Sequence, residues 1–236
     1  MIISNVEKKV GDFEIKINDL YIEAGKIHGI IGANGSGKTT LCKLIMGILD
    51  AESGQVDYQG INPKDITMAS QRPYFTHNSV YENICYPLKL RHRKIDEGRI
   101  DSLLEMCGLS DKKYQYARSL SSGEQQKVSM LRALVFEPEV IMIDETLSNL
   151  DPETTELFEQ MILEQQKRKP VTWILISHRL AHICKMCDQV HFMYRGSVIE
   201  SGESREILFE SEDKRIREFV ANEVIKVEDG HGITES

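Results

Sequence analysis

The stretch that decides the fold is GANGSGKTT, Gly32–Thr40, which follows an apolar run at 27–31 and precedes a helical pattern. Its three glycines allow the backbone to curl so that successive N–H groups point inward as an anion nest. The helix expected from Lys38 onward turns its positive end toward the same anion. With a strand before it and a helix after it, the stretch is more than a glycine-rich turn. It is typical of a phosphate-binding loop and predicts that the chain binds a nucleoside triphosphate.

Individual side chains of this phosphate loop have expected roles. Lys38 can reach the β- and γ-phosphates, and its charge would stabilise the phosphoryl group during transfer, which makes it a candidate catalytic residue. The Thr39 hydroxyl is placed to ligate Mg²⁺. The candidate nucleotide-binding residues of the loop are Gly32, Asn34, Gly35, Ser36, Gly37, Lys38, Thr39 and Thr40.

A second motif is the apolar run at 140–143, which ends in two carboxylates, Asp144 and Glu145. In a parallel sheet, the carboxyl end of such a strand lies beside the loop that holds the phosphates. Asp144 therefore suits the Mg²⁺ shell, usually through water. Glu145 lies one residue further, where a carboxylate can polarise the attacking water.

Composition restricts the class of protein. With 236 residues, 41% hydrophobic and 28% charged, the chain is an ordinary globular sequence with one large domain. Its net charge of −8 argues against a general nucleic-acid binder. No run approaches the roughly 18 apolar residues of a membrane span, and the N-terminus lacks the apolar core of a signal peptide. We therefore expect a cytoplasmic protein that contacts membranes only through a partner.

Five scattered cysteines do not form a disulfide framework. Cys184 and Cys187, near His178 and His182, have a spacing that zinc could use. No second pair of this kind exists in the sequence, so small apolar residues on one helix face are the better interpretation.

Strand-like runs alternate with amphipathic helical patterns, which predicts an α/β fold. The first two strands alternate apolar and polar residues, as in antiparallel strands with one solvated face. The expected strands are 2–6, 13–22, 27–31, 140–143, 172–176 and 190–193; the expected helices include 95–107 (stopped by Gly108), one opened by Asp151-Pro152, and one through Ile216–Val224. Residues 227–236 offer too little apolar surface to offset their ordering entropy, so we expect disorder there.

The third motif is LSSGEQQ, Leu120–Gln126, called here the signature segment. Ser121 and Gly123 ahead of a helix make a second N-terminus that can receive an anion, although alone this is only a helix cap. The phosphate loop, the signature segment, IMIDE, the turn at 148–151 and His178 follow in the order and spacing of the ATP-binding cassette (ABC) ATPases. From about Ile2 to Gly202 the chain resembles this family.

The resemblance implies a P-loop NTPase (RecA-like) core with an antiparallel β subdomain and a small α-helical subdomain, at about 74–136 of an ATPase domain spanning 1–226. It implies ATP and Mg²⁺ as cofactors, and a head-to-tail dimer with a second copy of the chain. In that dimer, the ATP on one phosphate loop is closed over by the partner's signature segment. The resemblance adds Gln71, Ser121, Gly123 and Glu124 for the nucleotide. It also adds Gln71 to Thr39 and Asp144 for the metal, and His178 to Glu145 and Lys38 for catalysis.

Gln71 matches the family glutamine that touches Mg²⁺ and senses the membrane partner, and His178 matches the histidine that contacts the γ-phosphate. The chain also departs from the family pattern. Ser122 replaces a glycine and Glu124 an amide, so we expect binding across the dimer to persist in weakened form. Val10 lies near the place of the ring that stacks on adenine, and Phe13 is the nearest ring. Base selectivity is therefore expected to be loose.

Three functions are compatible with these motifs: the energy-coupling subunit of a membrane importer, a soluble ATPase such as those of iron–sulfur cluster assembly, and a binding module switched by ATP closure. Glu145 and His178 disfavour the third. The stretches 66–75, 80–84 and 87–91 resemble the permease-facing region of importer subunits, most closely those for tungstate and molybdate. Of the rings within 71–91, about half are expected to pack the helical lobe. The expected partners are integral membrane permease subunits and, indirectly, an extracytoplasmic substrate-binding protein, with no nucleic acid. The chain would lie on the inner face of the cell membrane.

Overall fold

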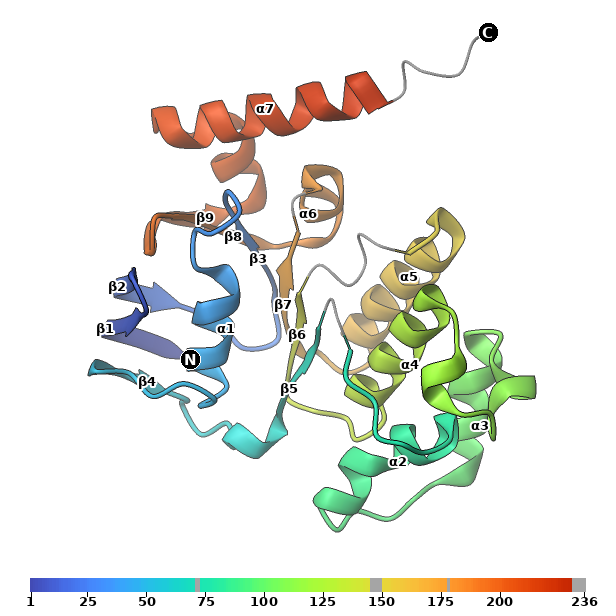
Figure 1. Cartoon of the computed structure of the whole chain (residues 1–236). Coiled ribbons are helices and arrows are strands. Elements are labelled where there is room, and N and C mark those ends of the chain that lie inside the picture. Colours follow the sequence, from blue (N-terminus) through green and yellow to red (C-terminus); the bar gives the residue numbers. More distant parts are fainter. Residues whose placement is uncertain (71–72, 145–149, 178, 231–236) are drawn as a thin grey trace, which may run out of the picture. The chain divides into compact units, whose positions relative to one another are not determined.

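Two units make up the chain in the computed structural model, which describes residues 1–70, 73–144, 150–177 and 179–230 (Figure 1). The first unit comprises Met1–Pro63 and Lys169–Ser236, and the second comprises Lys64–Arg168. The expected helical subdomain, 74–136, falls within the second unit, and its bounds stay a prediction.

An antiparallel sheet opens the first unit. β1 (Ile2–Val10) pairs with both β2 (Phe13–Tyr21) and β4 (Ser53–Asp57). Along β2, Ile15, Ile17 and Leu20 are buried while the residues between them are exposed. This alternation confirms the prediction of antiparallel strands with one solvated face.

The second sheet region of this unit is parallel except at its edge. β3 (Ile27–Ile31) lies between β7 (Thr172–Ile176) and β8 (Gln189–Tyr194) and is parallel to both, while β9 (Ser197–Glu203) pairs antiparallel with β8. Every residue of β3 and β7 is buried, as expected for strands covered on both faces. A mixed sheet beside an antiparallel sheet confirms the predicted α/β class.

The remaining elements of the first unit are helical: α1 (Lys38–Ile45), α6 (Leu180–Met186), the π-helical turn Glu206–Glu210 and α7 (Lys214–Gly230). In α7, Ile216 is buried and the Phe219 ring lies 5.5 Å from that of Phe192, which confirms an amphipathic helix. α7 covers 227–230, for which the sequence predicted disorder, because extending a formed helix costs little. Residues 231–236 lie outside the described residues.

The second unit contains β5 (Ile66–Ala69) parallel to β6 (Val140–Asp144). Its helices are α2 (Val80–Leu90), α3 (Glu97–Met106), α4 (Ser122–Leu134) and α5 (Pro152–Arg168), with 3₁₀ turns at Ser110–Lys112 and Ala117–Ser119. Two predicted boundaries are confirmed. Gly108 follows α3 with a φ of 65°, and Asp151 caps α5 by accepting the Thr154 N–H at 2.8 Å. None of the helices described here is long and apolar enough to cross a bilayer.

Two buried histidines form an uncharged hydrogen-bonded chain in the first unit. Nδ1 of His28 on β3 lies 3.0 Å from Nε2 of His191 on β8, and their rings stack with centroids 5.2 Å apart. His28 Nε2 lies 3.0 Å from the Glu23 carbonyl, which can only accept, so His28 carries its proton there. The proton order is then fixed from Ser201 Oγ through His191 to His28. Burial lowers the pKa of both imidazoles, that of His191 to about 3.

This chain predicts acid sensitivity of the fold. The unfolded chain takes up protons near pH 6.5, but the folded chain resists them, so stability is complete above that pH and falls as the pH drops toward 3. In urea unfolding, the free energy of unfolding should fall by at least about 2 kcal/mol between pH 7 and pH 5. His191→Gln should reduce this loss, whereas His92→Asn, at an exposed histidine, should not. An unchanged loss in His191→Gln would contradict the assignment.

Candidate functional site

The phosphate loop is shaped by its approach to β8. Gly32 has a φ of 142°, and a Cβ on it would lie 2.1 Å from the Met193 carbonyl oxygen. The Gly196 N–H, from the β8–β9 turn, donates to the Ser36 carbonyl at 2.9 Å. The β8–β9 hairpin therefore supports the loop. This contact could not be predicted from the sequence, because it joins segments about 160 residues apart.

The polar groups of the loop suit an anion. Lys38, only 7% exposed, donates from Nζ to the carbonyls of Gly32 at 2.8 Å and Ala33 at 3.0 Å, so its cation stays at the loop. Ser36 Oγ is buried and has no hydrogen-bond partner among the described residues. Gly37 caps α1 without a side chain, and the first turn of α1 has no acidic residue. A helix N-terminus, a cation and a hydroxyl without a hydrogen-bond partner among the described residues together suit a phosphate group.

The ring that meets this loop is Phe13. A Cβ on Gly37 would lie 3.1 Å from Phe13 Cζ, so the ring contacts the backbone where α1 begins. Val10, which is in register with Phe13 across the β1–β2 turn, is 44% exposed. The expectation that Phe13 is the nearest ring agrees with this packing, and its role in base recognition stays a prediction.

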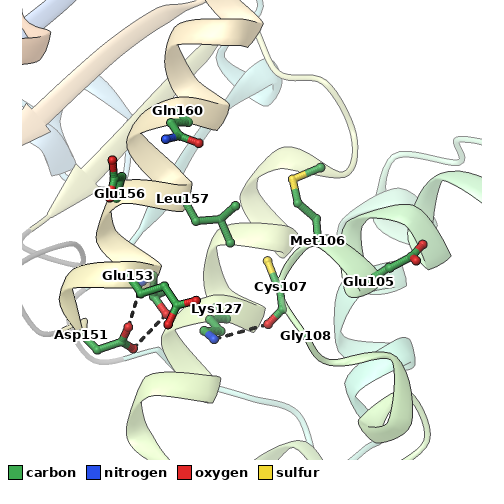
Figure 2. Close-up of a pocket in the computed structure, with 11 residues that line it drawn as sticks. Glu105, Met106, Cys107, Gly108, Lys127, Asp151, Glu153, Glu156, Leu157 and Gln160 are labelled. Carbon is green, nitrogen blue, oxygen red and sulfur yellow. Dashed lines mark hydrogen bonds between the residues drawn. The ribbon is translucent and has the colours of Figure 1, made fainter.

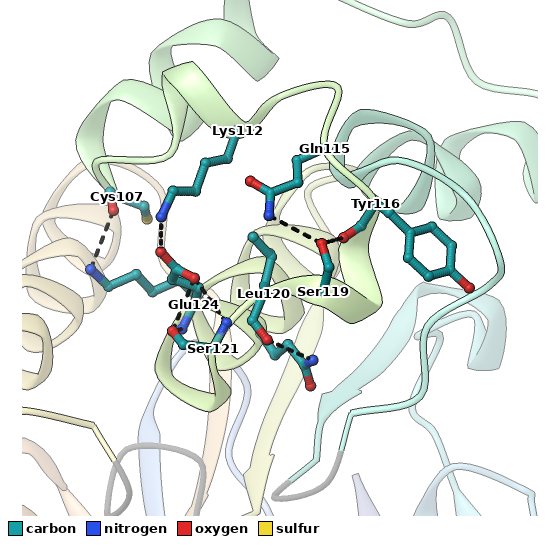
Figure 3. Close-up of polar contacts among 10 residues, drawn as sticks. Cys107, Lys112, Gln115, Tyr116, Ser119, Leu120, Ser121 and Glu124 are labelled. Carbon is teal, nitrogen blue, oxygen red and sulfur yellow. Dashed lines mark hydrogen bonds and ion pairs between the residues drawn. The ribbon is translucent and has the colours of Figure 1, made fainter.

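The signature segment enters α4 through a capping box. Ser121 Oγ accepts the Glu124 N–H at 3.4 Å, and the Ser121 N–H donates to Glu124 Oε2 at 2.9 Å (Figure 3). Gln125 Nε2 donates to the Leu120 carbonyl at 3.1 Å. Gly123 lies in the first turn, and a Cβ there would meet no atom within 4 Å, so the helix end is open at that point.

Glu124 is also held by a lysine. Lys112 Nζ, on the 3₁₀ turn Ser110–Lys112, forms an ion pair with Glu124 Oε1 (Figure 3). This pair, followed by the Ser121 N–H, lowers the pKa of the Glu124 carboxyl to about 2. Lys112 was not predicted from the sequence because it lies in the loop before the helix, where no periodic pattern links it to the signature segment.

A cavity of about 690 Å³ lies elsewhere in the second unit (Figure 2). Met106 and Leu157 contribute apolar lining, and Lys127 Nζ donates to the Cys107 carbonyl at 3.3 Å. The cavity is lined by four acidic residues and this one lysine; the acidic residues are Glu105, Asp151, Glu153 and Glu156. An excess of negative charge repels phosphates, so the cavity does not compete with the phosphate loop as a nucleotide site.

The candidate residues are divided between the units. Gly32–Thr40 lies in the first, with the Thr39 side chain exposed, while Ser121, Gly123, Glu124 and Asp144 lie in the second. Asp144 is the last residue of β6 and is partly buried, as predicted for a strand end. Gln71, Glu145 and His178 lie outside the described residues, so their roles stay predictions.

A buried strand, a glycine loop and a helix without an acidic first turn define the class: this is a P-loop nucleotide-binding protein. Comparison with known proteins refines that class. The family model for the ABC transporter matches residues 15–148. The chain belongs to the ABC transporter family.

Two relatives and one solved structure illustrate the match. The tungstate uptake system ATP-binding protein TupC of Peptoclostridium acidaminophilum is 36% identical over 206 residues, which cover 84% of this chain and 96% of TupC. The methionine import ATP-binding protein MetN 4 of Oceanobacillus iheyensis is 32% identical over 238 residues, which cover 92% of this chain and 69% of MetN 4. The structure of CbiO1 from Clostridium perfringens, part of the ABC transporter complex CbiONQ, has a TM-score of 0.72 at 26% identity and covers 98% of this chain and 94% of CbiO1.

Membership settles the general activity. ATP-binding proteins of ABC transporters are ATPases that couple ATP hydrolysis to transport, and this chain is one of them. The family resemblance and the P-loop fold expected from the sequence are thereby confirmed.

The contact between the loop and β8 gives a prediction for the fold. Gly32→Ala should lower the free energy of unfolding by roughly 3 kcal/mol or more, because its methyl group would overlap the Met193 carbonyl. Gly35→Ala is the control, since Gly35 also has a positive φ but open space around it, and should cost only about 1 kcal/mol. Equal losses in urea unfolding would contradict the packing argument.

Proposed function

We propose that the chain energises an importer whose cargo is an oxyanion of the tungstate or molybdate type. The observation that carries this proposal is the match to TupC, a tungstate uptake protein, over 96% of that protein's length. The resemblance of the stretches 66–75, 80–84 and 87–91 to the permease-facing region of such importers supports it. Both relatives reported above are named for uptake or import, which favours an importer over the soluble iron–sulfur alternative.

Methionine is the second candidate cargo, because MetN 4 matches nearly as well. MetN 4 is longer than the matched region, however, whereas TupC is matched along almost its whole length. In either case an extracytoplasmic binding protein and the permease would choose the cargo, and this chain would supply the energy from the inner face of the membrane.

In the proposed site, Lys38 and Ser36 bind the terminal phosphates of ATP, together with the N–H groups at the start of α1. Thr39, Gln71 and Asp144 are the proposed Mg²⁺ ligands; the exposed Thr39 hydroxyl and the Asp144 carboxylate are hard oxygen donors of the kind Mg²⁺ prefers. The ion would neutralise charge on the phosphates. Glu145 would orient water and His178 would contact the γ-phosphate, while Ser121, Gly123 and Glu124 of a second copy would close the site.

Docking to a permease is proposed for the exposed rings of stretch 74–90. Phe75 is buried, but Tyr74 is 76% exposed although its backbone and ring are held in place. Arg132 Nη1 donates to the Tyr74 carbonyl at 2.6 Å, and the Arg118 guanidinium lies 5.2 Å from the Tyr74 ring. A ring that is held and still exposed is preorganised for a partner.

The ATP site predicts a loss of activity in Lys38→Ala. Removing the cation should lower the ATPase rate of the purified chain by at least about a hundredfold while the fold is retained. Lys43→Ala, in the last turn of the same helix, is the matched control and should remain active. Wild-type turnover by Lys38→Ala would contradict the site.

The same variant tests the cargo. In cells that lack the gene, the wild-type chain should restore tungstate uptake, measured as cell-associated metal, and Lys38→Ala should not. Restored methionine uptake without any change in tungstate would favour the second cargo. If neither is restored although ATPase activity is present, the import proposal fails.

The exposed ring predicts a loss of docking in Tyr74→Ala. Recovery of the permease in a detergent pull-down from native membranes should fall by at least about fivefold, because a presented aromatic ring contributes strongly to an interface. ATPase activity of the isolated chain should be spared. Tyr114→Ala is the control, since Tyr114 is 75% exposed but lies outside the docking stretch. Recovery of soluble partners alone, from either protein, would argue against an importer.

A further inference from the structure

The signature segment of this chain carries a negative charge at a helix end that is expected to meet a phosphate. Glu124 lies in the first turn of α4 and, with a pKa held at about 2, stays ionised at any working pH. A carboxylate there offsets the positive end of the helix and repels a phosphate. The segment can receive ATP only if that charge is compensated.

Glu124 also accepts the hydrogen bond that the Ser121 hydroxyl would otherwise donate to a phosphate. The Ser121 hydroxyl lies 2.9 Å from Glu124 Oε2, and because the ionised carboxylate can only accept, the hydroxyl donates to it. A serine hydroxyl has one proton, so the same proton cannot be given to a phosphate at that moment. A cation that lowers the negative charge on Glu124 Oε2 therefore weakens the hydrogen bond from the Ser121 hydroxyl.

Lys112 is placed to compensate the charge of Glu124 and to weaken the hydrogen bond between Ser121 and Glu124. Its ammonium pairs with Oε1, the carboxylate oxygen that does not bind Ser121 (Figure 3). Both side chains are partly buried, at 30% and 23% exposure, so solvent screens the pair less than it would a surface pair. The neighbouring Lys113 faces Glu97 and Asp101 instead, so it cannot substitute.

We propose that Lys112 is a positioning residue of the ATPase: by neutralising Glu124 it keeps the Ser121 hydroxyl and the N-terminus of α4 available to the γ-phosphate of ATP bound by a second copy. The inference rests on the proposed closure of the site by a second copy. Lys112 acts through Glu124 and touches no phosphate itself.

The fold does not depend on this pair alone. Other hydrogen bonds hold both ends of the segment that carries Lys112. At its start, Lys127 Nζ donates to the Cys107 carbonyl. At its end, Gln125 Nε2 donates to the carbonyls of Arg118 and Leu120. Ser121 and Glu124 keep their capping box without the lysine. A Lys112 variant should therefore fold, which its circular dichroism would show.

The test is a double-mutant cycle in the full-length chain. Lys112→Ala should raise the KM for ATP by about fivefold or more, whereas in the Glu124→Gln background the same substitution should change it by about twofold or less, because there is no carboxylate left to neutralise. Lys112→Arg should stay near the wild-type value. Lys113→Ala is the matched control for loss of a nearby positive charge and should also leave KM unchanged.

A second readout separates this role from general damage. ADP lacks the γ-phosphate, so the affinity of Lys112→Ala for ADP should equal that of the wild type, and a weakened ADP affinity would indicate a structural effect and overturn the proposal. Equal effects of Lys112→Ala in both backgrounds, or none in either, would also overturn it while leaving the proposed function intact. If the ATPase rate per wild-type chain did not depend on protein concentration and the chain stayed monomeric with ATP, the proposed closure by a second copy would be contradicted, and the role of Lys112 with it.

Discussion

The phosphate loop depends on a close contact between two backbones. Residue 32 passes so near the Met193 carbonyl that no side chain fits there, and the next strand's turn holds the loop through the Ser36 carbonyl. Loop and hairpin are separated by about 160 residues of sequence, yet each fixes the other. α1 begins at Lys38, directly after the glycines of the loop. The contact with the hairpin therefore also orients Lys38 and the first turn of α1.

The N-termini of α1 and α4 are both proposed to receive a phosphate, but the charges around them are opposite. α1 has a glycine cap and no acidic residue in its first turn, so no side chain of that turn offsets its positive end, and the Lys38 cation stands beside it. α4 has a capping box, in which the Glu124 carboxylate accepts the Ser121 N–H and the Ser121 hydroxyl accepts the Glu124 N–H. The first arrangement suits a phosphate, and in the proposed closure by a second copy the second arrangement would receive one with its carboxylate neutralised by Lys112.

Buried polar groups in the first unit show how structural and functional groups differ. His28 and His191 are buried with every ring nitrogen partnered and no charge, so they stabilise the core at neutral pH. Ser36 Oγ is equally buried but has no partner among the described residues. An unpaired buried hydroxyl costs free energy, and at a phosphate loop that cost is recovered when a phosphate binds.

The sequence by itself determined the features whose causes are local. The glycine pattern of the phosphate loop, the caps at Asp151 and Ser121, the stop at Gly108 and the alternation along β2 follow from nearby residues, and periodicity and capping chemistry reveal them. The order and spacing of the phosphate loop, the signature segment, IMIDE, the turn at 148–151 and His178 were sufficient to indicate the family. The sequence did not predict where α7 ends, because a helix that has already formed can extend by another turn at little cost in free energy.

Tertiary structure alone decided which distant groups meet. The approach of residue 32 to Met193, the stacking of His28 on His191 and the pairing of Lys112 with Glu124 arise only after strand register and helix packing are set. The physical reason is that each contact joins segments whose separation in sequence carries no periodic signal. A single side chain at the wrong register would face the other side of its strand, so only the folded sheet specifies the partner.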